Sequence, residues 1–129
     1  STGGSTTGAS ELSYNPTVIT DISSDMDIAH EEIFGPIATI FTFKDEADVI
    51  RQANDTIYGL AAYFYSGSYA RSWRVTEGLE YGIIGHNTGL ISTEVEPFGG
   101  IKQSGFGREG SKYGIEEYVV TKYWCSDVS

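Results

Sequence analysis

Two adjacent acidic residues, followed by an aromatic residue and a break in the chain, form the first segment that can bind a ligand. The acids are Glu31 and Glu32, Phe34 follows, and Gly35-Pro36 ends any helical turn. A carboxylate here can accept both hydrogen bonds of a ribose diol, and Phe34 can offer an apolar face to a flat ring. Alternatively, the acids only favour a helix N-terminus and Phe34 belongs to the core. Taken alone, the residues favour this second interpretation.

A glycine-rich stretch from Glu96 to Glu109 is the second segment that can form a binding site. It lies within residues 88–110, a long run with six glycines and no pattern of helix or strand. The glycines permit unusual dihedral angles, and the aromatic and cationic side chains between them can converge on a pocket. Long loops of this kind are usually functional in compact domains. A mobile surface loop explains the composition equally well.

The pattern G-x-G-x-x-G occurs at residues 105–110, where it can place backbone amides against a pyrophosphate at the start of a helix. The context of a dinucleotide-binding turn is missing. No predicted strand runs directly into the pattern. We therefore interpret the pattern as loop geometry.

Metal binding and nucleophilic catalysis find little support in the sequence. His30 and His86 have no cysteine or histidine at metal-ligand spacing, so both are expected to be structural and no metal site is predicted. Cys125 lies in a terminal β run with only Lys122 nearby, so we expect a buried or edge thiol rather than a nucleophile. No serine stands in a G-x-S-x-G elbow. No residue of this chain is therefore assigned a catalytic role.

Composition limits the class of protein. The 129 residues are 40% hydrophobic and 13% aromatic, enough for one domain with a core. The net charge of -10 argues against nucleic acid and against an anionic membrane surface as partners. No apolar run approaches the ~20 residues of a spanning helix, no signal peptide is evident, and the single cysteine fits a reducing compartment. We expect a soluble, cytoplasmic chain.

Strands and helices alternate along most of the sequence. Asp45 can cap a helix over residues 46–54, and Ser68 can cap a second helix that extends to Leu79. Short β-branched or apolar runs predict strands at residues 17–21, 37–43, 60–65 and 81–87. The run at 37–43 is apolar on both sides, so we expect it to be buried on both faces. This order predicts an α/β fold with a mostly parallel sheet and flanking helices.

The two ends of the chain depart from this alternation. Residues 1–13 are rich in Ser, Thr and Gly, so a flexible loop or cut surface is expected, with order beginning near Asn15. Residues 117–125 have the composition of a strand, and residues 126–129 form a tail. Nothing follows this strand to cover its edges, so we expect it to join another sheet and act in assembly.

Three motifs in the same order resemble the aldehyde dehydrogenase superfamily. Residues 31–36 match E-E-x-F-G-P, residues 54–61 match N-D-T-x-Y-G-L-A, and residues 97–109 match P-F-G-G-x-K-x-S-G-x-G-R-E. Within that family, residues 63–66, 87–92 and 107–115 are similar to succinate-semialdehyde dehydrogenases. One departure is His86, where an aliphatic residue is usual. The resemblance covers nearly everything from Tyr14 to Cys125 and implies the C-terminal part of the aldehyde dehydrogenase fold, with residues 14–116 in the catalytic domain and 117–125 as an oligomerisation strand.

The resemblance also implies roles for four residues. By motif position, Glu32 binds the ribose next to the nicotinamide of NAD or NADP, and Phe34 packs near the nicotinamide ring. Phe98 lines the tunnel for a small aldehyde. Ser92 hydrogen-bonds the distal carboxylate of a semialdehyde, beside arginines from elsewhere in the chain. A hydroxyl alone cannot neutralise that charge, so local cations are needed.

The family reaction joins thiolate attack on the aldehyde, hydride transfer to NAD(P), and hydrolysis by a water that a glutamate activates. The motifs of that cysteine and glutamate do not occur in this sequence. We therefore expect a C-terminal fragment that is inactive alone, binds the cofactor poorly, and comes from a parent that oxidises succinate semialdehyde or a similar aldehyde in the cytoplasm or the mitochondrial matrix. The alternative is a non-enzymatic assembly module that binds intact subunits through its last strand. A free-standing nucleotide-binding domain would need a complete fingerprint.

Overall fold

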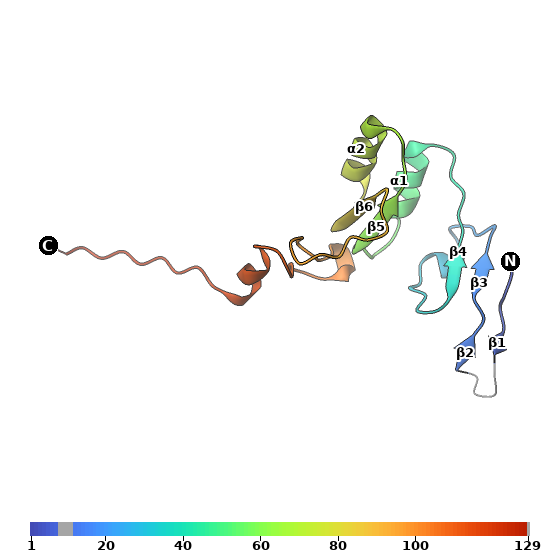
Figure 1. The fold of residues 1–129 in the computed structure, drawn as a ribbon, viewed down its shortest axis with the longest axis horizontal. Helices are drawn as coiled ribbons and strands as arrows, with labels where there is room; N and C mark the ends of the chain where they lie inside the picture. The colour runs from blue at the N-terminus through green and yellow to red at the C-terminus, as the bar shows by residue number, and fades with distance from the viewer. Residues whose placement is uncertain (8–11, 129) are drawn as a thin grey trace. The chain divides into compact units, whose positions relative to one another are not determined.

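The computed structural model describes residues 1–7 and 12–128. The chain divides into two compact units, Ser1–Val49 and Ile50–Ser129, which are described separately (Figure 1). Residues 8–11, in the middle of the segment expected to be flexible, lie outside the described residues. Together the two units contain short parallel strand pairs and two α-helices, which confirms the predicted α/β class.

The first unit contains two strand pairs. Strands β1 (Thr6–Thr7) and β2 (Ser13–Tyr14) pair antiparallel, whereas β3 (Thr17–Ile19) and β4 (Ile37–Thr39) pair parallel, with a 3-10 helix at Asp27–Ala29 between them in sequence. The expectation that order begins near Asn15 is wrong, since β1 and β2 both precede that residue.

A single buried threonine explains why the first residues are ordered. Thr17 is buried, its hydroxyl donates to the carbonyl of Asn15 at 2.8 Å, and the amide of Gly4 donates to it at 2.9 Å. The backbones of Thr2 and Val18 exchange a further pair of hydrogen bonds, both 3.0 Å long. The local composition predicts a flexible segment. These hydrogen bonds between residues distant in sequence nevertheless give backbone amides and carbonyls of the segment their partners.

The expectation that residues 37–43 form a strand buried on both faces is wrong. Strand β4 ends at Thr39, and the side chains of Ile40, Phe41 and Phe43 are all exposed. Apolar residues on both sides of a strand are buried only when a layer covers each face. Among the described residues of this unit, no element covers these side chains.

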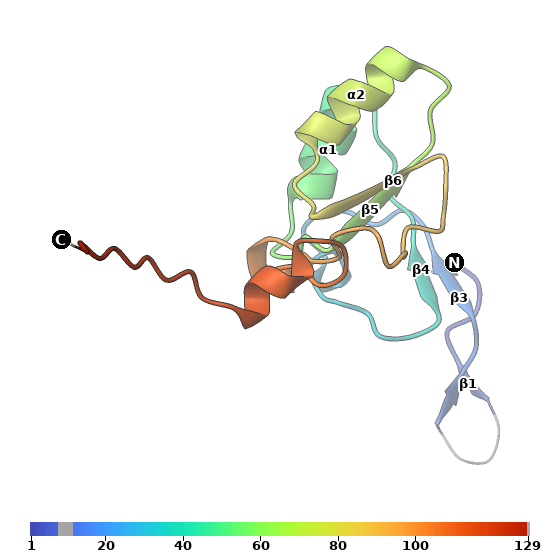
Figure 2. The ribbon, with the colours of Figure 1, turned by 60° about the vertical axis from the view of Figure 1, so that its left-hand side comes forward.

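The second unit is built around a β-α-β crossover. Strand β5 (Ala61–Phe64) leads into helix α2 (Tyr69–Gly78) and then into β6 (Ile83–His86). The two strands pair parallel, with Ala61 opposite Ile83 and Phe64 opposite His86, and α2 runs beside them (Figure 2). The mostly parallel sheet of the prediction is thus present as two separate pairs, β3–β4 and β5–β6.

Both α-helices begin where the sequence predicts. In α1 (Glu46–Asn54) the carboxylate of Asp45 accepts from the amide of Asp48 at 2.9 Å. In α2 the hydroxyl of Ser68 accepts from the amide of Arg71 at 3.4 Å. These side chains satisfy amides that have no partner within the helix, which confirms the two predicted N-caps.

The C-terminus of α1 is held by side chains distant in sequence. The Tyr81 hydroxyl donates to the carbonyl of Ala53 at 2.6 Å. The Lys102 ammonium donates to the carbonyls of Asn54 and Thr56 at 3.0 and 3.2 Å, and pairs with the Glu80 carboxylate at 2.6 Å. Carbonyls at a helix end lack intrahelical donors, so these contacts satisfy them. We call Tyr81, Glu80 and Lys102, with the carbonyls they hold, the α1 brace.

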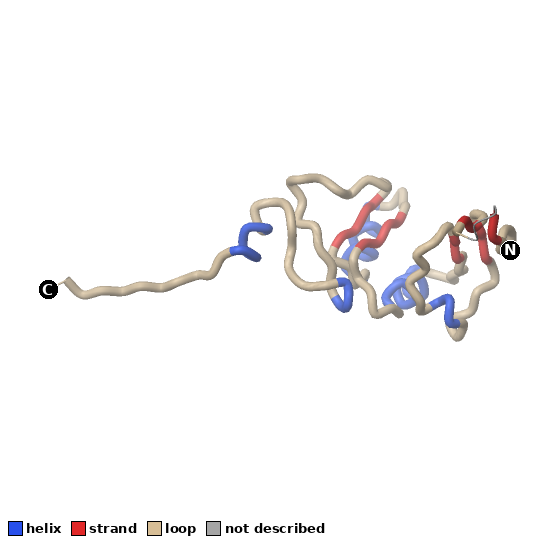
Figure 3. Tube along the Cα trace, turned by 90° about the horizontal axis from the view of Figure 1, so that it is seen from below, coloured by secondary structure: helices blue, strands red, loops and turns tan. Residues whose placement is uncertain are grey.

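The chain after β6 is almost entirely loop (Figure 3). It contains two short 3-10 helices, at Lys102–Ser104 and Gly114–Tyr118. Residues 119–128 have no regular structure, so the strand expected at 117–125 is not formed. A terminal strand needs a partner edge for its hydrogen bonds, and the described residues of this chain provide none.

Little of the apolar surface is buried. Among the described residues, Val75 is the only buried hydrophobic side chain, whereas many large ones are exposed, such as Leu90, Phe106 and Trp124. Exposed apolar area on this scale marks surfaces that contact other protein segments. No helix in the described part of the chain is long and apolar enough to cross a membrane.

The α1 brace predicts a graded effect of two substitutions. Lys102→Met removes the donors to two helix-end carbonyls and should lower the free energy of unfolding by about 1–2 kcal/mol. Glu80→Gln is the matched control, because its carboxylate is more than half exposed and the ion pair should contribute only about 0.5 kcal/mol. Urea denaturation measures both. Equal losses would mean that the ion pair, not the carbonyls, is what Lys102 contributes.

Tyr81 predicts an alkaline loss of stability. Burial raises the pKa of the Tyr81 hydroxyl above its ordinary value of 10.0, Lys102 lowers it, and Glu80 raises it. The folded state therefore holds this proton more tightly than the unfolded chain, so the contribution is complete below pH 10.0 and is lost as the pH rises further.

Tyr81→Phe should make the unfolding free energy fall less steeply above about pH 10. Urea denaturation at a series of pH values checks this, and the other eight of the nine tyrosines provide the common background. Identical slopes for the two proteins would contradict the role of Tyr81.

Candidate functional site

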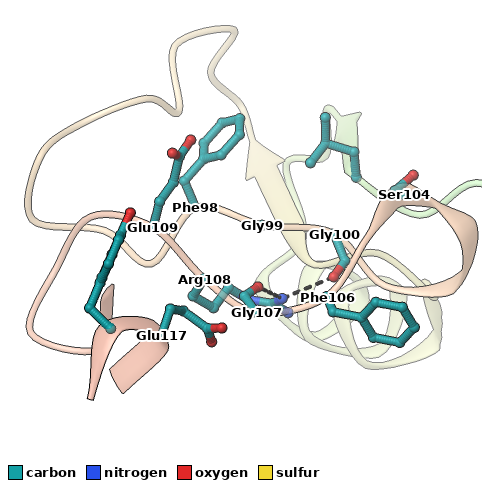
Figure 4. A pocket seen from close by; sticks show the side chains of 11 residues that line it. Phe98, Gly99, Gly100, Ser104, Phe106, Gly107, Arg108, Glu109 and Glu117 are labelled. Atoms are coloured by element: carbon teal, nitrogen blue, oxygen red, sulfur yellow. Dashed lines mark hydrogen bonds between the residues drawn. The ribbon is translucent and has the colours of Figure 1, made fainter. Parts of the chain in front are cut away.

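A cavity of about 420 Å³ lies in the second unit, between the glycine-rich stretch and the 3-10 helix at Gly114–Tyr118 (Figure 4). Its walls combine aromatic and charged side chains: Phe98, Phe106, Tyr118, Arg108, Glu109 and Glu117. We call this cavity the Phe98 pocket. Residues 98–100, 104 and 106–109 of the glycine-rich stretch line this pocket.

The two ends of the glycine-rich stretch are tied together by backbone hydrogen bonds. The amide of Phe98 donates to the carbonyl of Glu109 at 2.9 Å, and the amide of Glu109 donates back to Phe98 at 2.8 Å. This bridge closes the intervening residues into a loop and fixes Phe98, which is half-buried, in the pocket wall.

Arg108 holds the interior of this loop. One guanidinium nitrogen donates to the carbonyls of Gly100 and Gly107, at 2.9 and 2.7 Å (Figure 4). Buried carbonyls need donors, and a charged donor makes the stronger bond. The two cationic side chains of the glycine-rich stretch therefore have different roles. Arg108 lines the pocket, whereas Lys102 belongs to the α1 brace.

Glu117 and Tyr118 are pocket residues that the sequence did not indicate. They were expected in the terminal strand, but they finish the 3-10 helix and line the Phe98 pocket. The Glu117 carboxylate lies where a Cβ on Gly107 would be, with its atoms 2.5–2.7 Å from that position. Only glycine at residue 107, whose φ is +74°, permits this approach. No local pattern announces such a contact.

Ser92 is exposed and lies in the loop that follows β6. It shares the second unit with Phe98 but is not among the residues that line the Phe98 pocket. Its role toward a substrate carboxylate remains a prediction from the resemblance.

Glu32 and Phe34 lie in the first unit, between the 3-10 helix at Asp27–Ala29 and β4. Glu32 is exposed, and the Phe34 side chain is 94% exposed. The interpretation of Phe34 as a core residue is therefore wrong for this chain. Both side chains are free to meet a ligand or another protein segment.

The remaining candidates from the sequence are the two histidines, Cys125 and the glycine pattern at residues 105–110. His30 contacts the carbonyl of Ser24 at 2.6 Å, and His86 contacts the Ser72 hydroxyl at 2.8 Å. Cys125 is exposed, so of the expected buried or edge thiol the buried alternative is wrong, since residues 119–128 pack against nothing described. The pattern at residues 105–110 lies between two 3-10 helices rather than between a strand and a helix. Among the described residues, no three metal-binding side chains gather at one place.

The motifs, the β-α-β crossover and the Phe98 pocket define the class of protein. The chain belongs to the aldehyde dehydrogenase family, which matches residues 1–124.

Comparison with individual proteins narrows the similarity. The chain is 64% identical over 112 residues to the mitochondrial succinate-semialdehyde dehydrogenase of Arabidopsis thaliana, covering 87% of this chain and 21% of that protein. It is 62% identical over 112 residues to the NADP(+) succinate-semialdehyde dehydrogenase of Escherichia coli K12, covering 87% and 23%. The crystal structure of succinate-semialdehyde dehydrogenase from Burkholderia pseudomallei superposes with a TM-score of 0.93 at 57% identity, covering 99% of this chain and 27% of that one. The chain thus spans about a quarter of the length of the proteins it matches.

The contact between Gly107 and Glu117 predicts the effect of a small substitution. Gly107→Ala should lower the free energy of unfolding by about 1–2 kcal/mol, because alanine is strained at positive φ and its methyl group displaces the carboxylate. In a Glu117→Ala background the displacement is absent, so the same substitution should cost less. Urea denaturation of the four proteins in this cycle measures the difference. Equal costs in the two backgrounds would show that strain alone acts.

Proposed function

We propose that these residues belong to an NAD(P)-dependent dehydrogenase that oxidises succinate semialdehyde, or a related semialdehyde, to the carboxylic acid. The Phe98 pocket is the main support for this proposal, because its aromatic side chains can contact the carbon chain of an aldehyde. The stretch that builds the pocket is the one to which the resemblance assigns the aldehyde tunnel. The names of the Arabidopsis and Escherichia coli relatives supply the substrate class.

We assign cofactor binding to Glu32 and Phe34 of the first unit. Both are exposed, so the carboxylate can accept two ribose hydroxyls and the ring can meet a flat aromatic group. These residues fit NAD or NADP, which would accept hydride from the substrate when bound. The name of the Escherichia coli relative states NADP(+).

The substrate's distal carboxylate falls to Ser92. Its hydroxyl can donate one hydrogen bond, which orients a carboxylate but does not neutralise it. The chain is itself acidic, with a net charge of -10, so cations beside Ser92 are needed to balance the negative charge of the substrate carboxylate. We propose that arginines outside these residues supply the positive charge. We propose that the nucleophilic cysteine and the glutamate base also lie outside these residues.

Assembly falls to residues 117–125. Beyond the 3-10 helix, Val120, Tyr123 and Trp124 are 91%, 86% and 84% exposed, with no partner strand in the described part of the chain. Exposed apolar side chains on an extended segment suit addition to the sheet edge of a second subunit. The same observation favours the second candidate function, an assembly module without activity of its own. We place the protein in the cytoplasm or in the mitochondrial matrix.

The complete gene product and the 129-residue polypeptide, assayed side by side, test this proposal. The readout is NAD(P)H absorbance with succinate semialdehyde and either cofactor. We expect turnover by the complete protein and none by the 129 residues alone. A complete gene product of 14.0 kDa without turnover would favour the assembly module. Turnover by the 129 residues would show that they hold a nucleophile that we have not identified.

Two substitutions separate the substrate side from the cofactor side. Ser92→Ala should raise KM for succinate semialdehyde about tenfold, because a hydrogen bond to a charged group is lost, and should leave KM for butanal unchanged. Glu32→Gln is the matched control and should raise KM for NAD(P) without changing KM for either aldehyde. Steady-state kinetics of the complete protein measure all three. An equal effect of Ser92→Ala on both aldehydes would contradict its assignment to the carboxylate.

A further inference from the structure

His86, the last residue of β6, joins three parts of the second unit. Its Nε2 atom lies 2.8 Å from the Ser72 hydroxyl of α2 and 3.2 Å from the carbonyl of Ser66, which precedes α2. Its ring stacks on Phe64 of β5, with 4.9 Å between the ring centroids and 30° between the planes. A histidine with only a packing role would not need two polar partners for one nitrogen.

The hydrogen-bond partners agree with one direction for these bonds. The Ser72 hydroxyl lies 2.9 Å from the carbonyl of Ser68, to which it can donate, and it can then accept from His86. The Ser66 carbonyl is also an acceptor. In the tautomer with a hydrogen on Nε2, His86 shares that hydrogen between Ser72 and Ser66. Ser72 is only 6% exposed, whereas His86 is exposed.

Asn87, the next residue, holds Ser66 a second time. Its side-chain oxygen accepts from the amide of Ser66 at 2.9 Å, and its side-chain nitrogen donates to the Ser66 carbonyl at 2.9 Å. Asn87 has a φ of +56°, so the chain turns sharply here as it leaves β6. Consecutive side chains at the end of β6 thus bind both backbone groups of Ser66. We call His86, Asn87 and Ser66 the Ser66 clamp.

The loop that carries Ser92 begins at this clamp and folds back onto β6. A Cβ on Gly85 would lie 2.9 Å from the Ile91 side chain and 3.1 Å from the carbonyl of Thr88. The loop therefore rests directly on the strand, and Ile91 is seated over Gly85. Ser92 follows Ile91. Its position therefore depends on the direction in which the chain leaves the Ser66 clamp and on the contact between Ile91 and Gly85.

We propose that His86, where the family usually has an aliphatic residue, is in this chain a positioning residue for Ser92 and thereby for the recognition of aldehydes with a distal carboxylate. His86 holds the end of β6 against Ser66. This contact sets the path of residues 88–92 and thereby the position of the Ser92 hydroxyl. The part concerning the substrate rests on the proposed function, whereas the part concerning the loop does not.

His86→Leu in the complete protein removes the donor and keeps an apolar side chain, and His86→Gln restores a donating nitrogen. His86→Leu should raise KM for succinate semialdehyde about three- to tenfold, the effect of a weakened polar contact, with kcat and KM for butanal unchanged. His86→Gln should lie near the wild type. Ser72→Ala is the matched control, because it removes the partner on α2 but leaves the clamp, and it should leave both KM values unchanged.

Amide hydrogen exchange tests the loop independently of activity. In His86→Leu the amides of residues 88–92 should exchange about tenfold faster than in His86→Gln, because a local opening becomes easier, while those of α1 should not change. Unchanged loop exchange, or an equal rise of KM for both aldehydes, would overturn the proposal. If the wild-type protein does not oxidise the semialdehyde, the proposed function is wrong, and the exchange result still decides whether His86 holds the loop.

Discussion

The ammonium group of Lys102 joins the carbonyls of Asn54 and Thr56, at and just beyond the end of α1, to the middle of the glycine-rich stretch, and the pocket loop depends on that junction. Carbonyls at a helix end lack intrahelical donors, and Lys102, 48 residues further along the sequence than Asn54, supplies one here. The same place is tied down by the amide of Gln103, which donates to the carbonyl of Ile57 at 2.9 Å, and by the Ser104 hydroxyl, which accepts from the amide of Gly59 at 2.9 Å. These contacts fix residues 101–104, which lie inside the loop that the bridge between Phe98 and Glu109 closes.

The pocket is built mainly by backbone. The bridge between Phe98 and Glu109 closes the loop, and the guanidinium of Arg108 satisfies two carbonyls inside it. Glycine at residue 107 then allows the Glu117 carboxylate to approach the main chain. Because few side chains are buried, hydrogen bonds rather than packing hold this part of the chain in shape.

Several apolar side chains at both ends of the chain are exposed. Phe34 and the side chains beyond Tyr118 are exposed, although aromatic residues are normally at least half covered. A ligand, another segment or a second subunit is the physical means to cover them. The proposed roles of Phe34 at a nicotinamide ring and of residues 117–125 at a sheet edge both meet this need.

The sequence by itself determined the elements whose signals are local. Asp45 and Ser68 mark the starts of α1 and α2, and the apolar runs at residues 60–65 and 81–87 mark β5 and β6. The tertiary structure alone decided which cation lines the pocket, that Glu117 lies beside it, and that β4 stays uncovered. Caps and periodicity act within one or two turns of the chain, whereas burial, strand pairing and pocket walls depend on contacts between distant residues.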